Sequence, residues 1–170
     1  MRAAVTAGCR SIEHGFFMGA ENLERMAERG TVWVPTAVTM QAYAAQLAAA
    51  GRDPGPARRT LDHQLAQMER ARRLGVTVVL GTDAGTPGVD HGAAVIEEMR
   101  LLMQAGYAFA EAVRCSAVNG ALLAGGTSGL LASGRAASFV VHAAGPDEAL
   151  LSRGGAVKAV FVNGVVVLGD

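Results

Sequence analysis

Residues 76–92 read VTVVLGTDAGTPGVDHG, and this stretch decides how we interpret the fold. It opens with an unbroken apolar run, as expected for a parallel β-strand covered on both faces. Asp83 follows the run inside a glycine-rich turn, and His91 lies shortly after it. In α/β folds, ligands and catalytic groups collect at the carboxyl ends of the strands. Asp83 is therefore the first candidate for a functional carboxylate.

The segments around this strand predict an alternation of strands and helices. A short apolar segment ends at His14, and residues 20–30 follow with helical spacing and a closing glycine. Residues 31–37 repeat the strand signal. Further helices are expected over residues 57–75, 93–106 and 109–126. This order predicts an α/β fold of about three βα units.

The C-terminal residues differ in composition and pattern from the residues before them. Residues 137–143 and 157–169 are short and β-rich. The dipeptide Asn163-Gly164 between two valine-rich arms is a strong signal for a two-residue hairpin. We therefore expect a small antiparallel element after the α/β part. The expected division is 1–128 for the α/β part and 129–170 for the β-rich segment.

Composition and charge narrow the classes of function. The chain has 170 residues, of which 51% are hydrophobic, enough for one core. Its 15 basic and 15 acidic residues balance and form no long run, so nothing supports binding to nucleic acid or to a membrane surface. No apolar run approaches a membrane span. Cys9 and Cys115 match no metal spacing and no secretory signal is recognisable, so we expect a cytoplasmic protein with reduced thiols.

Two predicted strand ends bring an imidazole and a carboxylate to one edge of the sheet. His14 holds, two strands earlier, the place that Asp83 holds after its own strand. Strands lie ~4.8 Å apart, so the two positions are separated by about 10 Å, a gap that two side chains and a metal with bonds of about 2 Å can span. This pair of donors suits a zinc-type ion, which lowers the pKa of its bound water to about 7.

Each polar residue also has a purely structural interpretation. Asp83 can be explained as a helix cap or turn residue, and His14 as a hydrogen-bonded histidine at a strand end. His91 can simply open the next helix. His63 is best explained as solvated surface, and His142 as part of the β-rich segment. Only the combination of residues favours a functional site.

That combination resembles a known family. The motifs are, in order, SIEHG (11–15), VPT (34–36), GTDAG (81–85) followed by HG (91–92), EAVRCSAVNGALLAG (111–125), GLLASGRAASFVV (129–141) and VKAVFVNGVVV (157–167). Together they resemble the C-terminal part of the amidohydrolase superfamily, in the branch of imidazolonepropionase-like enzymes and metal-dependent dipeptidases. The resemblance covers nearly the whole chain.

The resemblance implies the C-terminal portion of a β/α barrel, TIM-like, with strands equivalent to the sixth to eighth, flanked by a small β-sandwich. Such enzymes carry one or two divalent metals, zinc foremost. His14 matches the histidine after the sixth strand that binds metal or contacts substrate. Asp83 matches the aspartate after the eighth strand that binds metal and moves the proton of the attacking water. His91 matches a histidine that lines the substrate pocket.

Several parts of the family pattern are not found in these 170 residues. They are the HxH motif of the first strand, the bridging lysine or glutamate of the fourth and the histidine of the fifth. Met1 begins inside what resembles the second half of a helix. We therefore expect a fragment whose open edges pair with a second copy or a complementary N-terminal half. The usual ADL before the last strands reads ASF, which places Ser138 where the family has a capping carboxylate.

The sequence leaves three classes of function open. The first is a metal-dependent hydrolase that cleaves a C–N bond in a small amide, peptide or cyclic amide through metal-activated water. The second is an inactive, truncated half-barrel that serves as an assembly or pairing module. The third is a doubly wound domain that binds a phosphorylated ligand, and the lack of a G-x-G-x-x-G or P-loop spacing after any strand counts against it.

Overall fold

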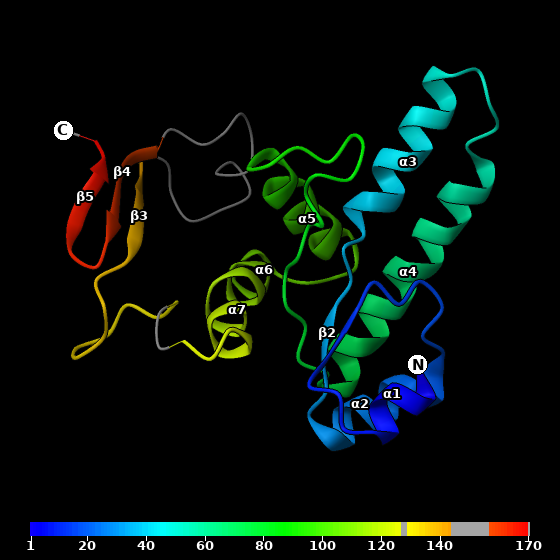
Figure 1. Cartoon of the computed structure of the whole chain (residues 1–170), viewed down its shortest axis with the longest axis horizontal. Coiled ribbons are helices and arrows are strands. Elements are labelled where there is room, and N and C mark those ends of the chain that lie inside the picture. The colour runs from blue at the N-terminus through cyan, green and yellow to red at the C-terminus, as the bar shows by residue number, and fades with distance from the viewer. Residues whose placement is uncertain (127–128, 144–156, 170) are drawn as a thin grey trace.

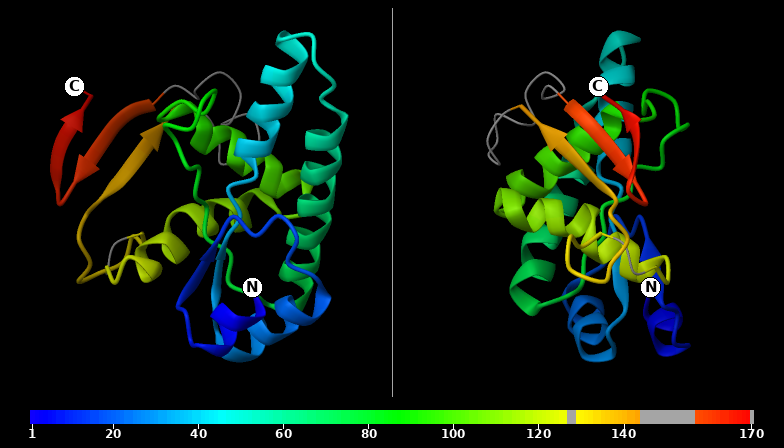
Figure 2. Two further views of the ribbon diagram at one scale, coloured as in Figure 1. Left: turned by 45° about the vertical axis from the view of Figure 1, so that its right-hand side comes forward. Right: turned by 90° about the vertical axis from the view of Figure 1, so that its left-hand side faces the viewer.

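The computed structural model describes residues 1–126, 129–143 and 157–169 (Figure 1). The first half contains α1 (Arg2–Thr6), β1 (Ser11–Glu13), α2 (Ala20–Arg29), β2 (Val32–Val34), α3 (Val38–Ala49) and α4 (Gly55–Leu74). The second half contains α5 (Ala93–Gln104), α6 (Phe109–Ser116), α7 (Val118–Leu123), β3 (Phe139–His142), β4 (Val157–Val162) and β5 (Val165–Leu168). Figure 2 shows α3 and α4 side by side and the sheet β3–β4–β5 beyond α5 to α7.

Three segments lie side by side in parallel, in the order of the sequence. β1 pairs with β2, and Ile12 lies opposite Trp33. The predicted third strand joins them through one parallel bridge between Trp33 and Val78. The Trp33 N–H donates to the Thr77 carbonyl and the Val79 N–H donates to the Trp33 carbonyl, each at 2.9 Å. The sequence therefore predicted this parallel order correctly.

In this third segment only Val78 forms a bridge to β2, and another part of the chain covers the segment's other edge. The Leu80 N–H donates to the Cys115 carbonyl at 3.1 Å, and the Asn119 side-chain amide donates to the Val78 carbonyl at 2.8 Å. These bonds come from the region of α6 and α7. The expectation of an open edge on this side was therefore wrong at these two positions.

The same contact explains why the helix predicted over 109–126 is broken. The Cys115 carbonyl bonds to Leu80 instead of to an N–H one turn further along the helix. The chain turns at Ala117, and α6 and α7 are separate helices.

The helix α3 is a second difference from the prediction, since no helix was predicted over its residues. It lacks a side-chain cap, and its apolar residues do not form one stripe.

The main hydrophobic core lies between the parallel segments and the helices. Ile12, Trp33 and Val78 form one row across the segments, and all three belong to this core. The helices contribute buried side chains that include Leu23, Met26, Met68, Leu101 and Leu102. Because side chains alternate along a strand, the neighbouring residues face the other side, where Glu13 and Thr77 are exposed. The helices thus cover one face and leave the other partly open.

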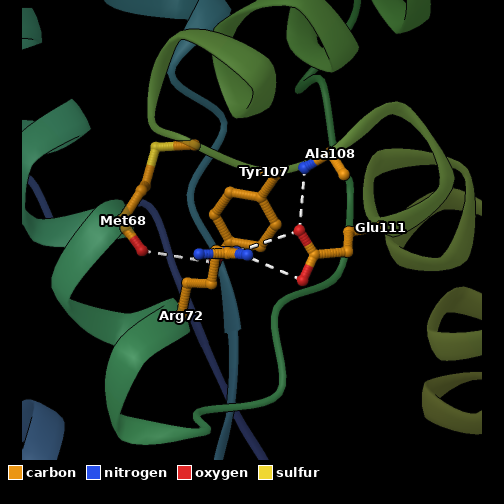
Figure 3. A network of polar contacts seen from close by, with 5 residues as sticks. All are labelled: Met68, Arg72, Tyr107, Ala108 and Glu111. Atoms are coloured by element: carbon orange, nitrogen blue, oxygen red, sulfur yellow. Dashed lines mark hydrogen bonds and ion pairs between the residues drawn. The ribbon is translucent and has the colours of Figure 1, made fainter.

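A polar network ties α4 to the start of α6 (Figure 3). The Arg72 Nε donates to both carboxylate oxygens of Glu111, at 3.1 and 2.9 Å, and Glu111 also accepts the Ala108 N–H at 2.7 Å. The Arg72 guanidinium lies 5.9 Å from the centre of the Tyr107 ring, and the Tyr107 hydroxyl donates to the Met68 carbonyl at 3.2 Å. Burial raises the pKa of Tyr107, so this hydroxyl remains a donor.

The β-rich segment contains the predicted hairpin. Asn163 and Gly164, at φ values of 51° and 82°, join β4 to β5, as a two-residue turn with two positive φ angles requires. The Ser138 hydroxyl accepts the Asn163 N–H at 3.0 Å and so caps this turn without a carboxylate. Part of this segment, 144–156, lies outside the described residues.

In the portion of the chain that the structure describes, no helix is long and apolar enough to cross a membrane.

Candidate functional site

One non-glycine residue with positive φ follows each parallel segment. These residues are His14 (63°), Thr36 (51°) and Asp83 (52°), and the hairpin residue Asn163 shares this property. Positive φ is uncommon for residues other than glycine, and for a β-branched threonine it is a true outlier. Such strain persists only where the surroundings hold it in place, and it concentrates at functional sites. The carboxyl edge of the three segments is therefore the candidate site.

His14 is held at the end of β1 by contacts from two sides. Its N–H donates to the Val34 carbonyl at 2.9 Å, and its carbonyl accepts the Trp33 indole N–H at 2.9 Å. The imidazole is half-buried, and its Nδ1 lies 2.8 Å from the Thr36 hydroxyl oxygen. The backbone of His14 is thus fixed from the core, and its ring is fixed by the next segment.

Thr36 lies in a buried loop between β2 and α3. The Gln64 side-chain amide donates to the Pro35 carbonyl at 2.7 Å, and the Thr39 hydroxyl donates to the Thr36 carbonyl at 2.8 Å. Beyond Thr36, the carboxylate of Glu98 accepts the N–H groups of Ala37 and Val38, at 3.0 and 2.7 Å. Glu98 on α5 therefore holds the N-terminus of α3 in place of an ordinary capping residue.

Asp83 opens an exposed loop. Its Oδ2 accepts the Thr86 hydroxyl at 2.9 Å, and its carbonyl accepts the Thr86 N–H at 3.2 Å. The Gly85 N–H donates to the Val89 carbonyl at 3.0 Å and closes the loop. His91 is exposed after this loop, with its Nε2 atom 3.8 Å from the place that a Cβ on Gly85 would occupy. Asp83 keeps its other oxygen, Oδ1, for a further partner.

The structure therefore brings His14 into contact with Thr36 and places Asp83 at the same edge, after the next segment. In residues 1–126, 129–143 and 157–169, no group of three or more His, Cys, Asp or Glu side chains is arranged to hold a metal ion. The exposed His63 lies against Phe17, with ring centres 5.4 Å apart. His142 on β3 borders an apolar cavity of about 900 Å³ between that sheet and the helices α5 and α6.

The sequence interpretation missed Thr36, Gln64 and Glu98. A signal for Glu98 was available, because this charged residue lies at helical spacing among apolar ones. The residues at that spacing are Ala94, Leu101 and Leu102, all of them buried. A buried carboxylate needs hydrogen-bond partners, and the pattern alone cannot name them. For Thr36 the motif VPT was visible, but its contact with His14 depends on how the segments pair.

Residues 2–167 match the model of the amidohydrolase family, and the chain belongs to this family. It is 33% identical over 112 residues to a protein of Mycobacterium tuberculosis (strain ATCC 25618 / H37Rv), which covers 64% of this chain and 30% of that protein. It is 30% identical over 128 residues to ochratoxinase of Aspergillus niger, covering 72% of this chain and 25% of the relative. The chain thus spans less than a third of the curated relatives that it matches.

Solved structures resemble this chain over nearly its whole length. A Xaa-Pro dipeptidase with bound methionine in its active site has a TM-score of 0.84 at 26% identity, covering 99% of this chain and 42% of that one. A. niger ochratoxinase has a TM-score of 0.82 at 26% identity, covering 99% of this chain and 39% of that one. The arrangement of helices and strands is therefore that of amidohydrolase-fold proteins, and these neighbours support a hydrolase.

Proposed function

We propose that the chain is the C-terminal part of a metal-dependent hydrolase that cleaves a C–N bond in a small amide, peptide or cyclic amide. The observation that carries the proposal is the placement of His14 and Asp83, both at positive φ, after parallel segments of an amidohydrolase-family chain. The similar Xaa-Pro dipeptidase supports the choice of bond, because its name denotes cleavage of a dipeptide.

The proposed architecture follows from the same similarity. Residues 1–128 would form part of a β/α barrel, with β1, β2 and residues 76–80 as its sixth to eighth strands. Residues 129–170 would belong to a flanking β-rich domain. The parallel order of the three segments and the antiparallel pairing of β3, β4 and β5 support this division. The rest of the barrel would come from chain outside these residues.

The donors at the site suit zinc in chemical kind but are too few in number. His14 offers a ring nitrogen and Asp83 a carboxylate oxygen, whereas catalytic zinc sites have three protein ligands. No group of three or more His, Cys, Asp or Glu donors is present among the described residues. We therefore assign His14 and Asp83 as two ligands of a site for one or two divalent metals, with the remaining donors supplied by another segment.

His14, Asp83 and His91 would have separate roles in the proposed reaction. The metal, when bound, lowers the pKa of water to about 7. His14 would present Nε2, since Nδ1 contacts Thr36. Asp83 would take the proton of the attacking water on Oδ1, because Oδ2 already accepts from Thr86. His91, at the rim of the same loop, would contact the substrate.

The test is the zinc content of the purified 170-residue chain and of the variants His14→Ala and Asp83→Asn, measured by elemental analysis. Because only two of the donors lie in this chain, the proposal expects zinc that binds weakly and that either variant loses. His63→Ala is the matched control, because this histidine is exposed on α4 and its ring lies against Phe17. Zinc that survives both site variants, or is lost in His63→Ala, would contradict the assignment.

A second candidate is a catalytically inactive pairing module. It is favoured by the shortage of metal donors in the described residues and by the position of β1 at the edge of its sheet. A chain that binds no zinc and forms a defined complex with a complementary barrel segment would support this candidate over the first.

The predicted cytoplasmic location stays a prediction. Both cysteines are free thiols, Cys9 exposed and Cys115 buried. Burial raises the pKa of the Cys115 thiol to about 11, which keeps it protonated and unreactive. Cys115 therefore acts as a core residue.

A further inference from the structure

We propose that Thr36 is a positioning residue that fixes the tautomer of His14, with the proton on Nδ1 and the lone pair on Nε2. The tautomer is a property of this chain alone. Its value for catalysis rests on the proposed function, in which Nε2 of His14 binds the metal.

The tautomer follows from the partners of one hydroxyl group. The Thr36 Oγ1 lies 2.7 Å from the Pro35 carbonyl and 2.8 Å from Nδ1 of His14. A carbonyl oxygen only accepts, so the single hydroxyl proton of Thr36 is donated to Pro35. Toward His14 the hydroxyl oxygen is then an acceptor, and Nδ1 must carry the proton. A neutral imidazole has one N–H, so Nε2 is unprotonated.

The loop around Thr36 holds this hydroxyl in its place. Thr36 is only 4% exposed and adopts a φ of 51°, which a β-branched residue avoids without support. The support comes from Glu98, whose carboxylate binds the two N–H groups that follow, and from the Thr39 hydroxyl on the Thr36 carbonyl. The backbone that carries this hydroxyl is therefore held by groups on α3 and α5 and not by His14.

The consequence concerns metal affinity. A histidine binds a metal through an unprotonated nitrogen, and the hydrogen bond of its other nitrogen fixes ring orientation and tautomer. Removing such a partner typically lowers metal affinity 10- to 100-fold. Under the proposed function, loss of the Thr36 hydroxyl is expected to weaken zinc binding by about this factor.

The decisive variant is Thr36→Val, which keeps the shape and branching of the side chain and removes the acceptor. The Pro35 carbonyl does not lose its last partner, because the Gln64 amide still donates to it at 2.7 Å. Thr36→Ala also removes the hydroxyl, and alanine is less strained than valine at positive φ. Thr36→Ser restores the hydroxyl. Thr31→Val is the matched control, since it changes another buried threonine, one that precedes β2 whereas Thr36 follows it.

The readout is the ¹⁵N spectrum of the imidazole nitrogens in the full chain, recorded at an alkaline pH at which the imidazole signals are those of neutral rings. His14→Gln identifies the His14 signals among those of the four histidines. We expect protonated Nδ1 in the wild type, in Thr36→Ser and in Thr31→Val, and a shift of the proton toward Nε2 in Thr36→Val and Thr36→Ala. A wild-type proton on Nε2, or unchanged protonated Nδ1 in both removal variants, would overturn the inference.

Zinc titration of the same proteins separates this inference from the proposed function. A wild type that binds zinc and a Thr36→Val variant that binds it 10- to 100-fold more weakly would support both. Equal affinity despite an altered tautomer would overturn the link between Thr36 and the metal. If the wild type binds no zinc, the metal assignment fails, and the tautomer experiment still decides the role of Thr36.

Discussion

The carboxylate of Glu98 experiences two opposing effects. It is fully buried, and removal from water raises its pKa to about 7. The N–H groups of Val38 and Ala37 favour the charged form and act in the opposite direction. Burial is the larger effect. Glu98 therefore carries a proton in part of the molecules near neutral pH.

We expect this residue to make the chain less stable as the pH rises. The pKa in the folded state is about 7 against a usual 4.5, so between these values the folded state binds more protons than the unfolded state. The unfolding free energy should then fall from about pH 4.5 to about pH 7, by an amount on the order of 3 kcal/mol, and level off above.

Thermal and urea unfolding of the wild type and of Glu98→Gln across this pH range would test the expectation. The fall should disappear in Glu98→Gln, which cannot ionise. Glu97→Gln, a change at the half-exposed neighbour that pairs with Arg100, should leave the fall intact. If the unfolding free energy decreased equally with pH in Glu98→Gln and in the wild type, another titrating group would be responsible for the decrease.

Among the elements, β2 and the end of the third parallel segment come close together at Gly81. A Cβ added there would overlap the Cγ1 atom of Val34. Gly81 has no positive φ, so the requirement for glycine is one of space. This close approach brings the loop of Asp83 next to that of Thr36.

Gly81→Ala should destabilise the chain by about 1–3 kcal/mol, the usual cost of overpacking. Val34→Ala alone removes a buried side chain and should also destabilise. In the double variant the overlap is gone, so its loss of unfolding free energy should be smaller than the sum of the losses in the two single variants. Chemical denaturation of all four proteins measures this coupling, and simple additivity would show that the two side chains do not meet.

The start of α6 depends on Glu111, which accepts the Ala108 N–H and pairs with Arg72. The Ala108 N–H and, second, the Arg72 guanidinium lower the pKa of Glu111. A lowered carboxyl pKa contributes stability above its usual value, and this stability is lost as the pH falls through the folded-state value.

Glu111→Ala should therefore cost about 1 kcal/mol at neutral pH, as the loss of a helix cap does, and less in acid. Glu69→Ala is the matched control. It breaks an exposed ion pair with Arg73 within α4, which is worth about 0.3–0.5 kcal/mol. The melting temperatures of both variants, measured at neutral and at acidic pH, test this expectation. Equal decreases in melting temperature in the two variants would show that Glu111 acts only as a surface charge.

At the level of the whole molecule, apolar strand edges remain exposed. The four residues of β5, Val165 to Leu168, are all between 46% and 63% exposed. β1 is an edge strand, and the face of the parallel segments opposite the helices bears the exposed Glu13 and Thr77. Unpaired edges of this kind promote association.

We expect the isolated chain to self-associate, and sedimentation velocity measures it. Val165→Lys with Val167→Lys should reduce association through β5, because lysine on an edge opposes pairing. Leu122→Lys, which changes a 60% exposed residue of a helix, α7, and not of a strand, should not. A wild-type monomer that unfolds cooperatively would contradict both this expectation and the half-barrel architecture.

The sequence by itself determined the family, the parallel order of three segments and the hairpin at Asn163. The physical reason is that these features depend on local signals, namely apolar runs, glycine turns and short motifs in a fixed order. It also gave His14 and Asp83 as candidates, because residues after parallel strands gather at one edge. Their roles stay predictions.

Only the tertiary structure decided the contacts that hold the candidate site. Glu98 meets the start of α3 across 61 positions of sequence, and Thr36 meets His14 across 22. The break after α6 depends on a bond from Leu80 to Cys115. Such contacts form between distant residues brought together by packing, and buried polar groups must then find whatever partners the packing supplies.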